Sequence, residues 1–298
     1  MRRLVLVPFL VLASAASPAA EAGLRVVATT SSMGMLARTV GGDQVKVTVL
    51  APPDRDAHYL VAKPSMMVAL RNADLLVAVG ADLEVAWLPA ALQGANNPKI
   101  LPGAPGYFEG AAQIELIEKG AAADRSKGDV HPQGNPHYYL DPPRMAAVAK
   151  ALASRLGTLD PAHAAQFDGA AAVFEKQVEA RLPAWKQKAA GAPGIVFFHK
   201  DGNYLANLLG VPVLGYVEPL PGIPPSASSL KQLVSGLAGR KGVVLYTTFQ
   251  AADGPKFLQS TLGWPAQQLP LEVALDGDAA AYLALIDKWV AAVASSAP

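Results

Sequence analysis

The 298-residue chain contains no cysteine. This absence excludes disulfide bonds and thiolate metal ligands, and it leads us to expect a protein without a lipid-modified N-terminal cysteine. A secreted protein of this length can dispense with disulfides because its hydrophobic core is large enough to stabilise it.

Charged side chains are also scarce. They make up 16% of the residues, against 51% hydrophobic ones, and the formal net charge is +1. No basic stripe with interleaved aromatic residues is present, so we expect no nucleic-acid partner. Beyond the N-terminal segment, no apolar run reaches the roughly 18 residues that a membrane-crossing helix needs. We therefore expect a soluble product with a sizeable core.

Common enzymatic motifs are missing as well. The chain has no Gly-x-Ser-x-Gly elbow, no His-Glu-x-x-His helix, no phosphate-binding loop and no Gly-x-Gly-x-x-Gly after its first strand. The sequence predicts that the protein is not an enzyme.

Residues 1–22 have the pattern of a signal peptide. A basic start at Arg2 and Arg3 precedes an apolar stretch over residues 4–12, and Ala20-Glu21-Ala22 is typical of a cleavage site. Removal of this segment leaves 23 basic and 23 acidic residues. We expect a roughly neutral mature protein that starts near Gly23 and is secreted through the inner membrane into the periplasm.

Strands alternate with helices over residues 24–101, which is typical of a parallel sheet with right-handed crossovers. The predicted strands are residues 24–30, 45–50 and 75–80, with a short one around 99–101. The predicted helices are residues 33–40, 64–72 and 83–92, the last of them kinked at Pro89.

A long helix is predicted near the middle of the chain. Residues 103–134 look like an irregular surface excursion, and a helix over residues 143–156 follows. Residues 161–190 then form an almost unbroken helical pattern, which Pro183 should kink or divide. A helix of about 30 residues would be roughly 45 Å long, enough to join two lobes.

The second half repeats the alternation. Its predicted strands are residues 194–198, 211–218, 243–248 and 267–273, and its predicted helices are residues 203–209, 225–237, 255–262 and 279–294. The fold class is α/β, with two Rossmann-like lobes containing parallel sheets. We expect a lobe over residues 23–157, a linking helix over 158–191 and a second lobe over 192–298. Ligands of such sheets lie off the carboxyl ends of the strands.

Three of the five histidines stand at turns where they could meet. His58, His137 and His199 each neighbour an aromatic residue and follow a strand or lie in a proline-bounded turn. Each alone is more often structural, but as a trio they favour a metal, and neutral imidazole suits zinc. His131 and His163 are predicted to be exposed, with metal capture as an alternative for His131.

Several motifs together resemble the zinc and manganese receptors of ABC importers, the cluster A-I class of periplasmic solute-binding proteins. The most specific is Asn135-Pro136-His137-Tyr138-Tyr139-Leu140-Asp141-Pro142. It is accompanied by Thr29-Thr30-Ser31, by Lys63-Pro64-Ser65 after His58, by Ala73-Asp74-Leu75, by Phe198-His199 with Tyr204, and by the segment from Glu218-Pro219 to Ser226. The resemblance covers nearly all of the mature chain.

The resemblance implies two lobes joined by a rigid helix, with a metal in the cleft between them. It also implies that His58, His137 and His199 are ligands. Histidine at the third position is typical of zinc receptors, whereas manganese receptors carry a carboxylate there. Asp141 is either a hydrogen-bond acceptor for an imidazole or the cap of the next helix.

Two features depart from the family. The long histidine-rich and acidic loop of many zinc members is reduced here to Asp124, Asp129 and His131. The family often supplies a carboxylate ligand after its last strand, and here Glu272 matches best. Asp276, Asp278 or a water molecule are the alternatives.

The sequence thus predicts a monomeric, high-affinity periplasmic zinc receptor that delivers Zn²⁺ to the permease of an ABC importer. A periplasmic metallochaperone is a further candidate partner. The alternatives are a manganese receptor of the same fold, a zinc-dependent hydrolase that uses the same three histidines, and an adhesin-like surface protein.

Overall fold

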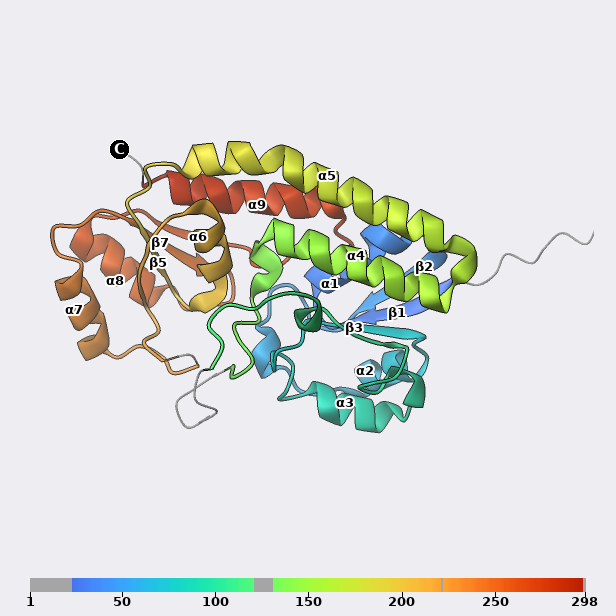
Figure 1. Ribbon diagram of the computed structural model, residues 1–298. Coiled ribbons are helices and arrows are strands. Elements are labelled where there is room, and N and C mark those ends of the chain that lie inside the picture. Colours follow the sequence, from blue (N-terminus) through green and yellow to red (C-terminus); the bar gives the residue numbers. More distant parts are fainter. Residues whose placement is uncertain (1–22, 121–130, 221, 297–298) are drawn as a thin grey trace, which may run out of the picture.

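Figure 1 shows the computed structural model of the chain, which describes residues 23–120, 131–220 and 222–296. The predicted signal peptide, together with Asp124 and Asp129, lies outside the described residues. Within those ranges, no helix combines the length and the apolar character that a membrane crossing requires.

The first sheet consists of four parallel strands in the order β2-β1-β3-β4. The central strands β1 and β3 are rich in buried Val, Leu and Ala, because helices cover both faces of the sheet. The strands are β1 (Leu24–Ala28), β2 (Val45–Val49), β3 (Leu75–Ala78) and β4 (Tyr107–Glu109). The accompanying helices are α1 (Ser31–Gly41), α2 (Pro64–Arg71), α3 (Leu88–Ala95) and α4 (Pro142–Leu159).

Two predictions for this lobe are wrong. The predicted strand around residues 99–101 is a 3-10 turn, Pro98–Ile100, and the fourth strand is β4, inside the stretch predicted to be irregular. The helix predicted from Leu83 begins at Leu88 instead. The chain first turns through Ala81 and Asp82, whose φ angles are 49° and 65°, and Pro89 then occupies the first turn of α3, where its missing N–H costs nothing.

The second sheet repeats the strand order of the first. Its parallel strands run β6-β5-β7-β8, so β8 is an edge strand. They are β5 (Ile195–Phe197), β6 (Val213–Tyr216), β7 (Val243–Thr247) and β8 (Ala266–Leu269). The helices of this half are α6 (Asn203–Leu209), α7 (Ala227–Gly236), α8 (Asp253–Leu262) and α9 (Ala279–Ala294).

The long helix α5 (Ala164–Ala189) packs on both lobes. It contacts α1 and α4 of the first lobe and α6 and α9 of the second, and Figure 1 shows it running along both. The predicted division at Pro183 does not occur, because this proline is exposed and the carbonyl that it leaves unpaired can bond to water.

One hydrophobic core extends through both lobes on the side covered by α5. It runs without interruption from Val26 of β1 to Val243 of β7, and it includes Phe174 of α5 and Tyr282 of α9. Two smaller clusters lie on the opposite faces of the sheets, under α2 and α3 in one lobe and under α7 and α8 in the other. The shared core fixes the distance between the carboxyl-terminal edges of the two sheets.

Candidate metal centre

His58 and His137 are held by the same local arrangement. His58 lies in a 3-10 turn (Ala57–Tyr59), and Oδ1 of Asp56 accepts its backbone N–H at 2.9 Å and lies 2.7 Å from its Nδ1. Oδ1 of Asn135 stands in the same relation to His137, at 2.9 Å and 2.7 Å. In each pair an oxygen-bearing side chain two residues earlier fixes both the backbone and the ring.

These contacts determine which ring nitrogen carries the proton. A carboxylate oxygen or an amide oxygen only accepts hydrogen bonds, so Nδ1 must be the donor in both histidines. The lone pair of each neutral ring then lies on Nε2, the nitrogen that points away from the turn. This is the protonation pattern that a metal-binding imidazole needs.

His199 is oriented by a neighbouring strand. It follows β5, and its Nδ1 lies 2.8 Å from Oε2 of Glu218, which follows the adjacent strand β6. Because parallel strands end at the same edge of a sheet, the two side chains meet at its carboxyl end. The carboxylate again places the proton on Nδ1 and the lone pair on Nε2.

The structure brings the three predicted histidines together. Their potential ligand atoms all lie within 4.8 Å of one another, and each residue is at most 8% exposed. The ring centroids are 5.1 to 5.8 Å apart. Among the described residues, Nε2 of His137 and of His199 has no hydrogen-bond partner. Buried lone pairs without a donor are costly unless a cation binds them.

The surroundings shift the pKa values of His137 and His199 in opposite directions. Burial, followed by the neighbouring histidines, lowers the pKa of His137 well below its usual value. Burial also acts to lower the pKa of His199, but the hydrogen bond to Glu218 and the charge of Asp201 outweigh it, so that this pKa is raised. The lowered pKa keeps His137 neutral, whereas the raised pKa makes His199 easier to protonate.

Two carboxylates approach the histidines. Asp201 is buried, with Oδ1 3.7 Å from Nε2 of His137 and Oδ2 accepting a hydrogen bond from Gln250. Asp201 is absent from the predicted site residues, although it lies two residues after His199. Glu272 lines the same hollow, but its Oε2 accepts the backbone N–H of Ser32 in the first turn of α1.

The remaining carboxylates predicted near the site have other roles in the structure. Asp276 and Asp278 are exposed, and Asp278 caps α9 by accepting the N–H of Ala281. Asp141 caps α4 through the N–H of Arg144 and also pairs with the side chain of that residue. Of its two predicted roles, the structure therefore displays the helix cap.

The prediction that His131 is exposed is wrong. His131 is half-buried, and its ring lies against those of His58 and His137. His163 is remote from this group and partly exposed, and it bonds to Asp160 at the start of the long helix. The sequence offered no local signal for His131, since the described residues that follow it, 132–137, form no helix or strand.

Comparisons with known proteins place the chain in a family. The family described as zinc-uptake complex component A, periplasmic (ZnuA), matches residues 26–296. The high-affinity zinc uptake system protein ZnuA of Yersinia pestis is 28% identical over 246 residues, which cover 78% of this chain and 77% of that protein. The manganese-binding lipoprotein MntA of Bacillus subtilis is 27% identical over 205 residues, covering 67% of this chain and 62% of MntA.

A crystal structure of ZnuA has the same fold. It matches with a TM-score of 0.72 at 23% identity and covers 91% of this chain and 99% of that one. The predicted resemblance and the predicted two-lobed α/β fold are both confirmed.

Proposed function

Because the chain belongs to the ZnuA family of periplasmic zinc-uptake components, we propose that it is a periplasmic zinc receptor and that His58, His137 and His199 hold the ion. The observation that carries this proposal is the convergence of three Nε2 lone pairs in a buried hollow. Each of the three rings has its other nitrogen engaged by an oxygen acceptor. Solute-binding proteins of this kind pass their cargo to the membrane permease of an ABC importer.

The donor set supports zinc over manganese. Imidazole nitrogen is a ligand that zinc favours, whereas manganese favours carboxylate, carbonyl and water oxygen. A tetrahedral zinc with Zn–N distances near 2.1 Å needs nitrogens about 3.4 Å apart. The separations of up to 4.8 Å between the histidine atoms allow closure to that spacing by small side-chain movements.

The carboxylate predicted as fourth ligand, Glu272, stays a prediction. Its side chain lines the hollow, and its hydrogen bond to Ser32 would have to be exchanged for a bond to the ion. We further propose that the protein is a monomer and that a periplasmic metallochaperone delivers zinc to it. The hollow between the lobes is a place where one such partner could donate or remove the ion.

The proposal is tested by stripping the purified protein with a chelator and titrating it with Zn²⁺ and Mn²⁺ against a chromogenic competitor. We expect one tight zinc equivalent and weak manganese binding, and we expect His137→Ala to abolish the tight site. His163→Ala is the matched control, because this histidine is remote from the hollow. Tight manganese binding with weak zinc binding would favour the manganese alternative, and no tight binding of either ion would refute a metal receptor.

A further inference from the structure

A fourth imidazole faces the three predicted ligands. Nε2 of His131 lies 3.1 Å from Nε2 of His58. The ring centroid of His131 is 5.2 Å from that of His58 and 5.9 Å from that of His137. His131 therefore stands at the edge of the metal hollow, on the side of His58.

The contacts made by the two Nδ1 atoms determine whether the Nε2 atoms of His58 and His131 carry a proton or a lone pair. Nδ1 of His58 bonds to the carboxylate of Asp56, and Nδ1 of His131 lies 3.2 Å from the carbonyl oxygen of Ala81. Both partners accept hydrogen bonds and donate none, so in the neutral rings both protons are on Nδ1. With these tautomers the two Nε2 lone pairs point at each other, an arrangement that a cation bound by both nitrogens stabilises.

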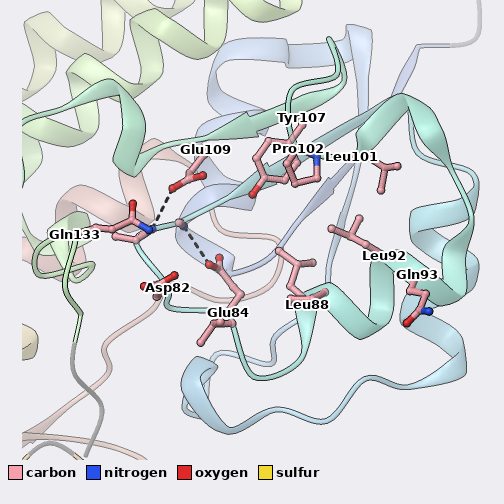
Figure 2. A pocket seen from close by; sticks show the side chains of 14 residues that line it. Asp82, Glu84, Leu88, Leu92, Gln93, Leu101, Pro102, Tyr107, Glu109 and Gln133 are labelled. Carbon is pink, nitrogen blue, oxygen red and sulfur yellow. Dashed lines mark hydrogen bonds between the residues drawn. The ribbon is translucent and has the colours of Figure 1, made fainter. Parts of the chain in front are cut away.

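The turn that holds His131 is itself held firmly. Gly80, Ala81 and Asp82 all have positive φ, at 87°, 49° and 65°. The carboxylate of Glu84 accepts the N–H of Gly80, and the carboxylate of Glu109 accepts the N–H of Ala81. Figure 2 shows the side chains of Glu84 and Glu109 near Asp82. The carbonyl of Ala81 is thus fixed by the first lobe, and it aims the ring of His131 at the hollow.

We propose that His131 is the fourth ligand, so that zinc is bound by four imidazole nitrogens. This inference rests on the proposed function, since it names the coordination of the same ion. Of the two carboxylates nearby, Glu272 accepts the N–H of Ser32, and Asp201 accepts from Gln250 through Oδ2 while its Oδ1 faces His137, so the test below includes variants of both. The 3.1 Å spacing between His58 and His131 is close to the roughly 3.4 Å expected for two nitrogens on one tetrahedral zinc.

Zinc K-edge X-ray absorption of the loaded protein counts the bound imidazoles directly. We expect four in the unaltered protein and three in His131→Ala, and we expect zinc affinity to fall by at least about tenfold, the lower end of the loss seen when a residue supporting a ligand is removed. His131→Gln, which keeps a polar side chain, should give the same coordination number as His131→Ala. Circular dichroism verifies that both variants fold.

Three further variants distinguish His131 from Glu272 and Asp201 as the fourth ligand. His163→Ala is the control and should leave four imidazoles, as should Glu272→Gln and Asp201→Asn. An unaltered protein with three imidazoles, a spectrum that His131→Ala does not change, or a ligand lost in either carboxylate variant would overturn the inference. In each of those cases tight zinc binding would still support the proposed function. Failure of the unaltered protein to bind zinc at all would instead refute both.

Discussion

Glu218 and His199 lie side by side because they follow two neighbouring parallel strands. The backbone N–H of Glu218 donates to the carbonyl of Phe198 at 2.9 Å, and this bond continues the ladder one step beyond β5 and β6. The register brings Oε2 of Glu218 to 2.8 Å from Nδ1 of His199. The second lobe thus orients its histidine by strand pairing, whereas the first lobe uses residues two positions earlier in the chain.

Removal of this carboxylate should weaken metal binding. We expect Glu218→Ala to lower zinc affinity by about 10- to 100-fold, because the ring of His199 loses its orientation and its preferred tautomer. Glu218→Gln should lose less, since an amide oxygen can still accept from Nδ1. Competition with a chromogenic chelator measures both variants. Glu179→Ala, on the exposed face of α5, is the control, and an affinity for Glu218→Ala equal to that of the control would contradict the prediction.

Most helices and strands could be predicted from periodicity together with start and stop signals. The helices α6 and α9 have the predicted bounds, because apolar residues recur at helical spacing between clear start and stop signals. Strand β4 was missed because its three residues alternate in burial and stand among glycines and prolines. The start of α3 was missed because positive φ at Ala81 and Asp82, neither of them glycine, has no signature in the sequence.

The site could be predicted only as far as its motifs reach. His58, His137 and His199 stand in recognisable segments, and the Asp or Asn two residues before the first two was available as a further signal. His131 approaches the site through the carbonyl of Ala81, a contact between segments 50 residues apart. Such a contact depends on the tertiary fold, and the local sequence pattern does not reveal it.

Glu272 should make the stability of the metal-free protein depend on pH. Burial raises its pKa from 4.5 to about 7, so the folded state retains a proton that the unfolded chain loses earlier. The stabilising contribution of this proton is complete below pH 4.5 and is lost as the pH rises through about 7. Relative to Glu272→Gln, the unaltered protein should lose up to about 3 kcal/mol of unfolding free energy between pH 4 and 8.

Urea denaturation at several pH values, with chelator present, measures this difference. All other ionisable groups are the same in the two proteins, so their contribution cancels in the comparison. Parallel pH profiles for the two proteins would show that Glu272 titrates normally.

Glu84 should be essential for the stability of the first lobe. It is buried, and its carboxylate accepts from the hydroxyl of Thr29 at 2.6 Å and from the backbone N–H groups of Val79 and Gly80 at 2.8 and 3.1 Å. Glu84→Leu leaves these donors without their acceptor and should cost about 3 kcal/mol or more. Glu84→Gln keeps an acceptor oxygen and should cost less. Equal urea midpoints for the unaltered protein and Glu84→Leu would contradict this reasoning.

Zinc binding should leave the relative position of the lobes almost unchanged. The shared core and α5 join them, Arg38 of α1 donates to the carbonyl of Gly277, and the hydroxyl of Tyr282 donates to the carbonyl of Tyr139. Small-angle X-ray scattering curves of the metal-free and zinc-loaded protein should therefore superimpose. A clear decrease in the radius of gyration on loading would instead indicate hinge closure.

The packing of α9 on α1 and α5 also has a consequence for how a newly made chain matures. Proteins are synthesised from the N-terminus, and N-terminal units usually fold first. Here the faces of α1 and α5 that pack against α9 stay uncovered until residues 279–294 have left the ribosome. The first lobe therefore completes its packing only after the C-terminal helix has been synthesised. A copy shortened before residue 279 leaves apolar faces of α1 and α5 uncovered and becomes a substrate for proteases.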